Sequence, residues 1–180
     1  KTLKRKHNIT NLLTHQLTIE NVARLDKSFD LIVCTGVLHH LADPDAGLRA
    51  LRSVLRPEGA MNLMVYAPYG RAGVYMLQEY CRRLGVGTSK EEIRDLTVAL
   101  KLLPQYHPLL ATVRASRHSL SAESLFDSLL HPRDRAYSVP ELFDFIERNG
   151  LTLGRWHWQA PYLPQCGLIA EAPHASRLIA

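Results

Sequence analysis

A strand–helix–strand pattern in the first third of the chain restricts its fold more than any other feature. Leu31-Ile32-Val33-Cys34 is a continuous apolar run, which is typical of a strand covered on both faces in a parallel sheet. Residues 45–56 follow with apolar side chains on one helical face, and Ala60–Tyr66 is a second apolar run. Such units are almost always right-handed crossovers. The sequence therefore predicts an α/β fold with a parallel core.

Helical patterns dominate the middle of the chain. Two capping boxes, Ser89-x-x-Glu92 and Ser138-x-x-Glu141, precede apolar residues at helical spacing. Gly150 is expected to end the second of these helices. We expect residues 1–180 to form a single domain in which 72–136 is a helical insertion that covers the site as a lid.

Three further segments carry strand patterns. Asn8–Leu17 has β-branched and apolar residues between polar ones and is predicted to be a strand. Leu151–Gln159 and Gln165–Ala172 are separated by a short connection, so they are predicted to pair as an antiparallel hairpin at the sheet edge. Arg56-Pro57-Glu58-Gly59 is expected to be a turn.

Composition excludes several classes of protein. The 180 residues are 46% hydrophobic and 22% charged, as expected for a globular domain with a core. No apolar run is long enough for a membrane-spanning helix, and the basic start KTLKRKHNITN is unlike a secretory signal. The three cysteines form no C-x-x-C pair. We therefore expect a reducing, cytoplasmic location and no membrane partner.

Charge gives little support for nucleic-acid binding. The net charge is +5, but the basic residues are dispersed, apart from a cluster within the first six residues. Neither a basic face nor an aromatic platform accompanies them.

The segment Phe29–Gly70 (FDLIVCTGVLHHLADPDAGLRALRSVLRPEGAMNLMVYAPYG) resembles a known family. It is similar to the second half of a class I S-adenosylmethionine-dependent methyltransferase. In that family Phe-Asp opens the fourth strand, and a loop like Gly36–Leu41 follows it. The next helix ends in a Leu-x-Pro-x-Gly turn, which Leu55–Gly59 matches, and a fifth strand then ends near the substrate, here at Tyr66–Gly70.

The resemblance implies a Rossmann-like sheet and S-adenosyl-L-methionine as cofactor, with one departure. The family has a Gly-rich turn after its first strand and an acidic residue at the end of its second, and this sequence shows neither. Its lone G-x-G, Gly85-Val86-Gly87, lies in the helical insertion. We therefore expect a partial sheet that lacks the N-terminal strands, a carboxyl-terminal fragment of the catalytic domain.

This truncation has physical consequences. Without the first two strands, Asn8–Leu17 has no neighbours, and the strand Leu31–Cys34 has one edge of unpaired amides and carbonyls. We expect poor solubility or association of the isolated chain, cofactor affinity far below that of a whole enzyme, and an inactive isolated chain.

The resemblance assigns cofactor contacts to two loops. Thr18, Ile19 and Glu20 would follow the third strand and contact adenine; the alternative is a turn with helix-starting residues. Cys34, Thr35 and Gly36 would line the methionine end of the cofactor, because open α/β sheets bind ligands at the carboxyl ends of their strands. The alternative there is an ordinary strand-to-helix turn.

Acceptor contacts are expected after both strands. One of two adjacent histidines, His39 rather than His40, is a candidate general base. Tyr69 would orient the acceptor, and Arg71 would hold an anionic group with its planar guanidinium. The alternatives are packing and a solvated arginine.

Other features have simpler interpretations. Adjacent histidines point in different directions and no H-x-H or H-x-x-x-H pattern accompanies them, so no metal site is expected. Asp43-Pro44 is a helix start, and Arg133-Asp134-Arg135 is a solvated, salt-bridged connector. Cys81 is a small core residue. Trp156 and Trp158 alternate with His157 along a strand.

The sequence thus favours methyl transfer to an acceptor, in order of preference a small molecule, a protein side chain or a nucleic-acid base. Two alternatives stay open. One is a non-catalytic interaction module that retains the fold, and the other is a dinucleotide-dependent oxidoreductase, because the crossover layout is common to both folds.

Overall fold

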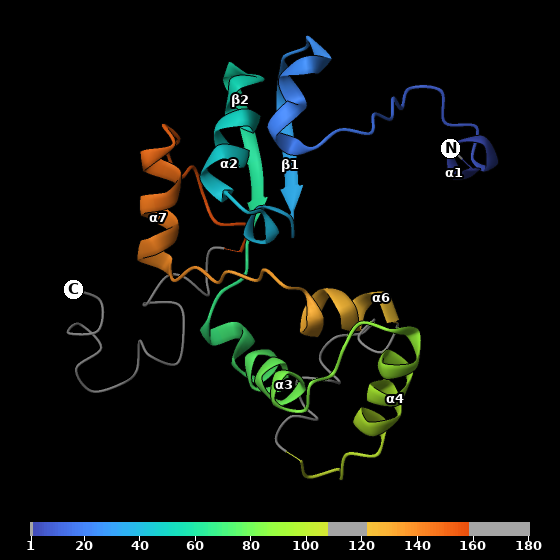
Figure 1. Cartoon of the computed structure of the whole chain (residues 1–180). Coiled ribbons are helices and arrows are strands. Elements are labelled where there is room, and N and C mark those ends of the chain that lie inside the picture. The colour runs from blue at the N-terminus through green and yellow to red at the C-terminus, as the bar shows by residue number, and fades with distance from the viewer. Residues whose placement is uncertain (1, 108–121, 159–180) are drawn as a thin grey trace. The chain divides into compact units, whose positions relative to one another are not determined.

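The structure is a computed structural model that describes residues 2–107 and 122–158 (Figure 1). The chain divides into two compact units, Lys1–Val139 and Pro140–Ala180, and each is described by itself. None of the described helices combines the length and the apolar character needed to cross a bilayer.

A parallel strand pair forms the centre of the first unit. Strand β1 (Phe29–Thr35) pairs with β2 (Leu55–Met64), and helix α2 (Pro44–Ser53) connects them (Figure 1). The α2 helix begins as predicted, because the Asp43 carboxylate accepts a hydrogen bond of 2.9 Å from the Ala46 N–H. The predicted α/β class and the parallel crossover are therefore confirmed.

The segment expected to be a turn, Arg56–Gly59, lies within β2 instead. Phe29 pairs with Leu55, whereas Leu31 pairs with Ala60, so the extra residues of β2 bulge out of the ladder. A Cβ on Gly59 would lie only 3.0 Å from the Asp30 carbonyl oxygen. The prediction of a turn is wrong because a bulge accommodates the Pro and Gly without interrupting the strand pair.

The two faces of β1 differ in burial. Cys34 is buried, whereas Leu31 and Val33 on the opposite face are 61% and 62% exposed. The expectation of a strand covered on both faces is therefore wrong for the described residues. The apolar run reflects strand propensity on one face and burial on the other.

The predicted strand Asn8–Leu17 is absent. Residues 9–18 are irregular between α1 (Thr2–Lys6) and the 3-10 helix η1 (Ile19–Leu25), and Leu12, Leu13 and Leu17 are exposed. Among the described residues the sheet has only two strands, so this segment has no ladder to join. An extended segment cannot form hydrogen bonds between its own backbone amides and carbonyls, so it needs a partner strand to become part of a sheet.

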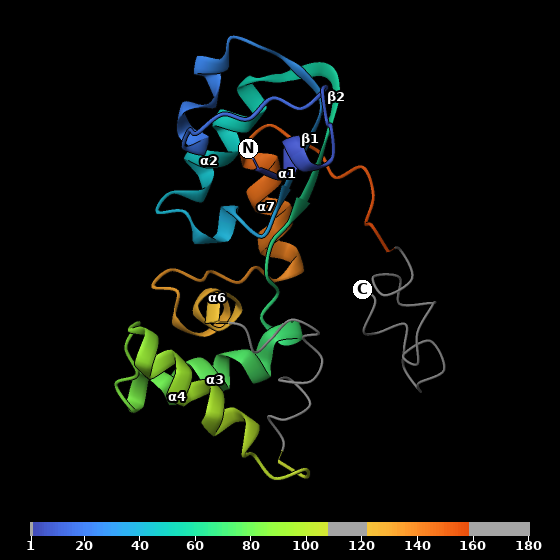
Figure 2. The same ribbon diagram turned by 90° about the vertical axis from the view of Figure 1, so that its right-hand side faces the viewer.

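A helical cluster follows β2. It comprises α3 (Ala72–Arg83), α4 (Lys90–Lys101), α6 (Ala122–Leu125) and the π-helix η4 (Phe126–Leu130), shown in Figure 2. These helices share their own buried core, formed by Leu77, Cys81, Leu96, Leu100, Leu125 and Leu129. The interpretation of Cys81 as a core residue is confirmed.

Local hydrogen bonds explain the ends of these helices. At the end of α3, Gly85 has φ +65°, and the Val86 N–H donates to the Cys81 carbonyl at 3.0 Å. The predicted capping box between Ser89 and Glu92 is present, and Glu92 also accepts from the Gly87 N–H at 2.9 Å. The lone G-x-G therefore ends one helix and supports the next.

The second unit begins with most of α7 (Val139–Arg148), whose Phe145 side chain is fully buried. The helix ends as predicted: Gly150 has φ +72°, and the Leu151 N–H donates to the Ile146 carbonyl at 3.0 Å.

The predicted terminal hairpin is not confirmed. Residues 151–158 form no strand, and Gln165–Ala172 lies outside the described residues. The Trp156 ring packs edge-on against Phe143, with centroids 6.1 Å apart. The prediction of an alternating strand for Trp156, His157 and Trp158 is therefore wrong. The segment is irregular, and its Trp156 side chain packs against Phe143 of the preceding helix α7.

Candidate functional site

Three segments of the first unit meet at the carboxyl ends of the two strands. Gly36, with φ +72°, follows β1 and donates its N–H to the Met64 carbonyl at 3.1 Å. The 3-10 helix η2 (Leu38–His40) comes next along the chain, and Tyr66 follows β2. Tyr66 forms a parallel bridge with Ala136. This edge is where open α/β sheets bind their ligands.

A buried ion pair joins two of these segments. Arg71, in the 3-10 helix η3 (Tyr69–Arg71), donates to the Asp134 carboxylate at 3.2 Å, and Gln78 donates to the same oxygen at 2.7 Å. The Arg71 guanidinium stacks 3.4 Å from the centre of the Tyr66 ring. The side chains of Arg71 and Asp134 are only 16% and 5% exposed. The interpretation of Asp134 as part of a solvated connector is therefore wrong, as is that of a solvated Arg71.

His39 packs against the Tyr66 ring. Its side chain is fully enclosed, and its ring centre is 3.8 Å from that of Tyr66. Burial lowers the pKa of His39 to about 4, and the neighbouring His40 acts in the same direction. The imidazole is therefore neutral at pH 7 and a weak base.

His40 has a defined tautomer. Its Nδ1 lies 2.6 Å from the Arg133 carbonyl oxygen, and because a carbonyl only accepts, Nδ1 carries the proton. Its Nε2 lies 3.6 Å from the Asp127 carboxylate. The rings of His40 and His131 are also close, with centroids 4.1 Å apart.

Buried polar atoms without a hydrogen-bond partner gather around this edge. We call the residues that supply them the carboxyl-edge cluster. The atoms are both ring nitrogens of His39, Nε2 of His40, Nε of Arg71, Oδ1 of Asp134 and the hydroxyl of Tyr75. Buried polar groups are nearly always satisfied in folded proteins. Their concentration makes this edge the candidate site for a polar ligand.

Only some of the residues predicted from the sequence belong to this cluster. His39 and Arg71 belong to it, whereas Tyr69 is 90% exposed and does not. Cys34 is buried and its pKa is raised by that burial, while Thr35 is exposed at the strand end. Sequence reasoning missed Tyr75, and no local pattern distinguished it.

Thr18, Ile19 and Glu20 lie at the start of η1, without a strand before them. The Thr18 hydroxyl accepts a hydrogen bond from the Asn21 amide at 2.9 Å. The Ile19 side chain packs close to Gly47 of α2. This geometry corresponds to a helix start.

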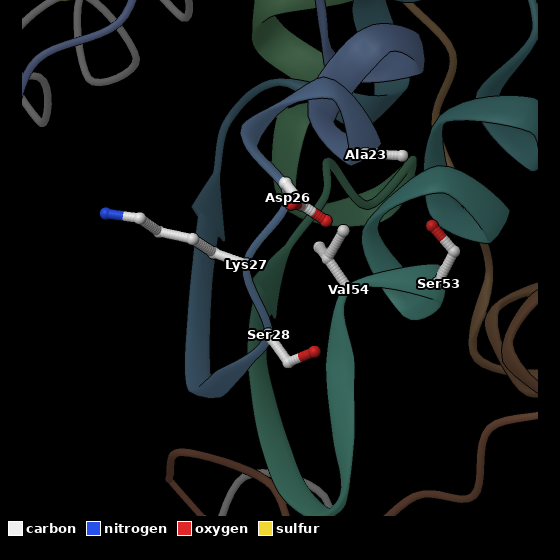
Figure 3. Close-up of a pocket in the computed structure, with 6 residues that line it drawn as sticks. All are labelled: Ala23, Asp26, Lys27, Ser28, Ser53 and Val54. Atoms are coloured by element: carbon white, nitrogen blue, oxygen red, sulfur yellow. The ribbon is translucent and has the colours of Figure 1, made fainter.

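A separate cavity of about 250 Å³ lies at the opposite ends of the strands (Figure 3). Its lining comes from the residues just before β1 and β2: Ala23, Asp26, Lys27, Ser28, Ser53 and Val54. None of the unsatisfied buried atoms named above lines it. We therefore take the carboxyl edge as the candidate functional site.

Comparisons with known proteins point to methyltransferases. Residues 2–61 match the family described as Methyltransferase domain. An uncharacterized protein of Synechococcus sp. is 38% identical over 154 residues, which cover 80% of this chain and 37% of that protein. The tRNA U34 carboxymethyltransferase of Campylobacter curvus is 37% identical over 54 residues, or 30% of this chain and 18% of that enzyme.

The structure of PKMT2 from Rickettsia typhi has a similar fold. The TM-score is 0.61 at 19% identity, and the match covers 84% of this chain and 31% of that one. The chain thus spans little more than a third of the Synechococcus relative, and less of the other two. Together the fold and these matches support a relationship to class I methyltransferase domains. The resemblance seen in Phe29–Gly70 is confirmed.

Proposed function

We propose that this chain supplies the acceptor-facing edge of an S-adenosyl-L-methionine-dependent methyltransferase whose acceptor is a small molecule. The observation that carries the proposal is the carboxyl-edge cluster, with its unsatisfied buried atoms at the ends of both strands. A polar acceptor placed there would satisfy groups that the protein leaves without partners.

The end of β1 fits the methionine end of the cofactor. Gly36 holds a positive φ, and a Cβ at this position would meet only the Met64 methyl, at 3.5 Å. The backbone there is open to close approach by a ligand. Thr35 and Cys34 would line this end, and Thr18, Ile19 and Glu20 would contact adenine. The cofactor supplies the electrophilic methyl group, so the chain has only to position and desolvate the acceptor.

The acceptor contacts follow from the charges of the cluster. Burial lowers the pKa of His39 to about 4 and makes it a weak base, so in this proposal it positions the acceptor through a hydrogen bond instead of serving as the general base expected from the sequence. Arg71 is already paired with Asp134, so the acceptor needs no net negative charge. Tyr69, at the exposed rim, is the third proposed contact.

Two glycines provide a matched test of the cofactor site. Gly36 and Gly85 have φ of +72° and +65°, and neither position would bring a new Cβ into a clash, so alanine imposes similar backbone strain at both. Binding of S-adenosylhomocysteine would be measured by calorimetry. We expect Gly36→Ala to weaken binding and Gly85→Ala to leave it unchanged.

The Synechococcus relative, which is longer than this chain, serves as the second protein in the assay. We expect tighter binding by that protein, because its additional residues can supply contacts beyond this edge. Absence of binding by both proteins would refute the proposed function and favour the interaction-module alternative.

A further inference from the structure

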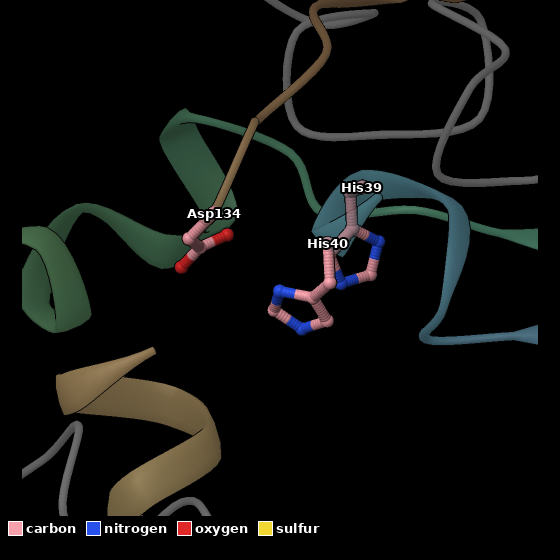
Figure 4. A group of neighbouring side chains, drawn as sticks. All are labelled: His39, His40 and Asp134. Carbon is pink, nitrogen blue, oxygen red and sulfur yellow. The ribbon is translucent and has the colours of Figure 1, made fainter. Parts of the chain in front are cut away.

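We infer that His39, His40 and Asp134 form a binding site for one divalent transition-metal ion of the zinc class. Each of the three residues offers one ligand atom, and these atoms all lie within 4.8 Å of one another. Figure 4 shows both imidazoles on one short helix, with the Asp134 carboxylate on a different segment of the chain. The sequence argument against a metal site lacked this third ligand.

The hydrogen bonds around the site leave one suitable atom free on each of two residues. The Arg133 carbonyl accepts a hydrogen bond from the Nδ1–H of His40, so the lone pair of Nε2 remains available. Arg71 and Gln78 both bind Oδ2 of Asp134, and Oδ1 has no hydrogen-bond partner. Metal-binding histidines commonly donate their second N–H to a carbonyl in this way, and ligating carboxylates are held by outer hydrogen bonds.

His39 supplies the independent indication of a ligand. Its side chain is almost completely buried, and neither ring nitrogen has a hydrogen-bond partner. A buried polar group that lacks a partner is unfavourable for the folded state. A metal ion bound to one of these nitrogens would give its lone pair a partner.

The distances require only a modest contraction. Ligands about 2.1 Å from a tetrahedral ion lie about 3.4 Å from one another. The most distant pair of donors, at no more than 4.8 Å, must therefore approach by at most about 1.4 Å. Asp127, whose carboxylate is 3.6 Å from Nε2 of His40, could complete the coordination, or a water molecule could do so.

Charge and donor type select the ion. Asp127 and Asp134 contribute two negative charges, and Arg71 offsets one of them. Two imidazoles with a carboxylate suit zinc, cobalt or nickel, whereas magnesium and calcium prefer oxygen ligands. The metal site shares His39, His40 and Asp134 with the carboxyl-edge cluster of the proposed function, but its test measures metal binding and no methyl transfer, so either proposal can fail without the other.

Titration of the chain with Co²⁺, followed by its visible absorption, is the first arm of the test, and Zn²⁺ competition is the second. We expect one equivalent of Co²⁺ to bind and Zn²⁺ to displace it. His39→Gln and Asp134→Asn should each weaken Co²⁺ binding at least about tenfold. His15→Gln removes an exposed histidine outside the cluster and should leave binding unchanged.

Circular dichroism of every variant separates loss of a ligand from loss of the fold. If His39→Gln does not fold, His40→Gln takes its place. Absence of stoichiometric Co²⁺ binding by the unmodified chain would overturn the inference. It would also be overturned if folded variants of His39, His40 and Asp134 bound as tightly as the His15 variant, since binding would then be adventitious.

Discussion

Asp134→Ala is expected to be among the most destabilising single changes in the first unit. It removes one partner of a buried ion pair and leaves the Arg71 guanidinium, only 16% exposed, without its carboxylate. Removing one partner of such a pair costs about 3–5 kcal/mol. The stacking of Arg71 on the Tyr66 ring, at 3.4 Å, is made with and without Asp134 and so cancels from this difference, and the partial exposure of Arg71 favours the lower end of the range. We therefore expect a loss of about 3 kcal/mol in the free energy of unfolding.

Urea denaturation followed by circular dichroism, with a metal chelator present, measures this loss. The double variant Arg71→Met/Asp134→Leu should recover most of it, because an apolar pair replaces the buried charges. Glu79 provides the control: it pairs with Arg82 on an exposed helix surface, so Glu79→Ala should change stability much less. Equal losses for Asp134→Ala and Glu79→Ala would refute the reasoning.

Two further predictions concern the helical cluster. Leu100→Ala deletes a buried side chain of its core and should lower the free energy of unfolding by about 2–4 kcal/mol. Leu102→Ala changes a position that is 76% exposed and should lower it by less than about 0.5 kcal/mol. Urea denaturation compares the two variants, and similar losses would contradict the assigned core. Hydrogen bonds from Ser89 and Gly87 lower the pKa of Glu92, so its contribution to stability is present above its unfolded pKa and is lost as the pH falls through the folded value. Glu92→Gln should flatten that acid-side decline in thermal melting temperature, and an unchanged pH profile would contradict the capping role.

Local sequence patterns predicted the elements that local forces build. The cap at Asp43 and the glycine ends of two helices depend on neighbours in sequence, and the crossover β1–α2–β2 pairs two strands that follow one another along the chain. The two segments wrongly predicted as strands, at Asn8–Leu17 and 151–158, carry the right alternation but lack a ladder among the described residues. A strand pattern states which residues can pair, and only tertiary structure supplies the partner.

The sequence predicted where the candidate site lies in the fold, but not all of the residues that form it. The carboxyl-end rule led to Gly36, His39 and Arg71, because it needs only the strand ends. Asp134 was missed because it lies in a run of charges that is typical of solvated connectors. Its burial results from a tertiary contact with Arg71, which no spacing in the sequence reveals.

The central claim is that ligands bind at the carboxyl edge of the strands. The most direct measurement is a titration of the ¹⁵N-labelled chain with S-adenosylhomocysteine, followed by amide chemical shifts, which also detect weak binding. We expect concerted shifts at Thr35, Gly36 and His39, with Ala23 and Lys27 beside the opposite cavity unchanged. Shifts confined to Ala23 and Lys27, or no shifts at all, would contradict the account.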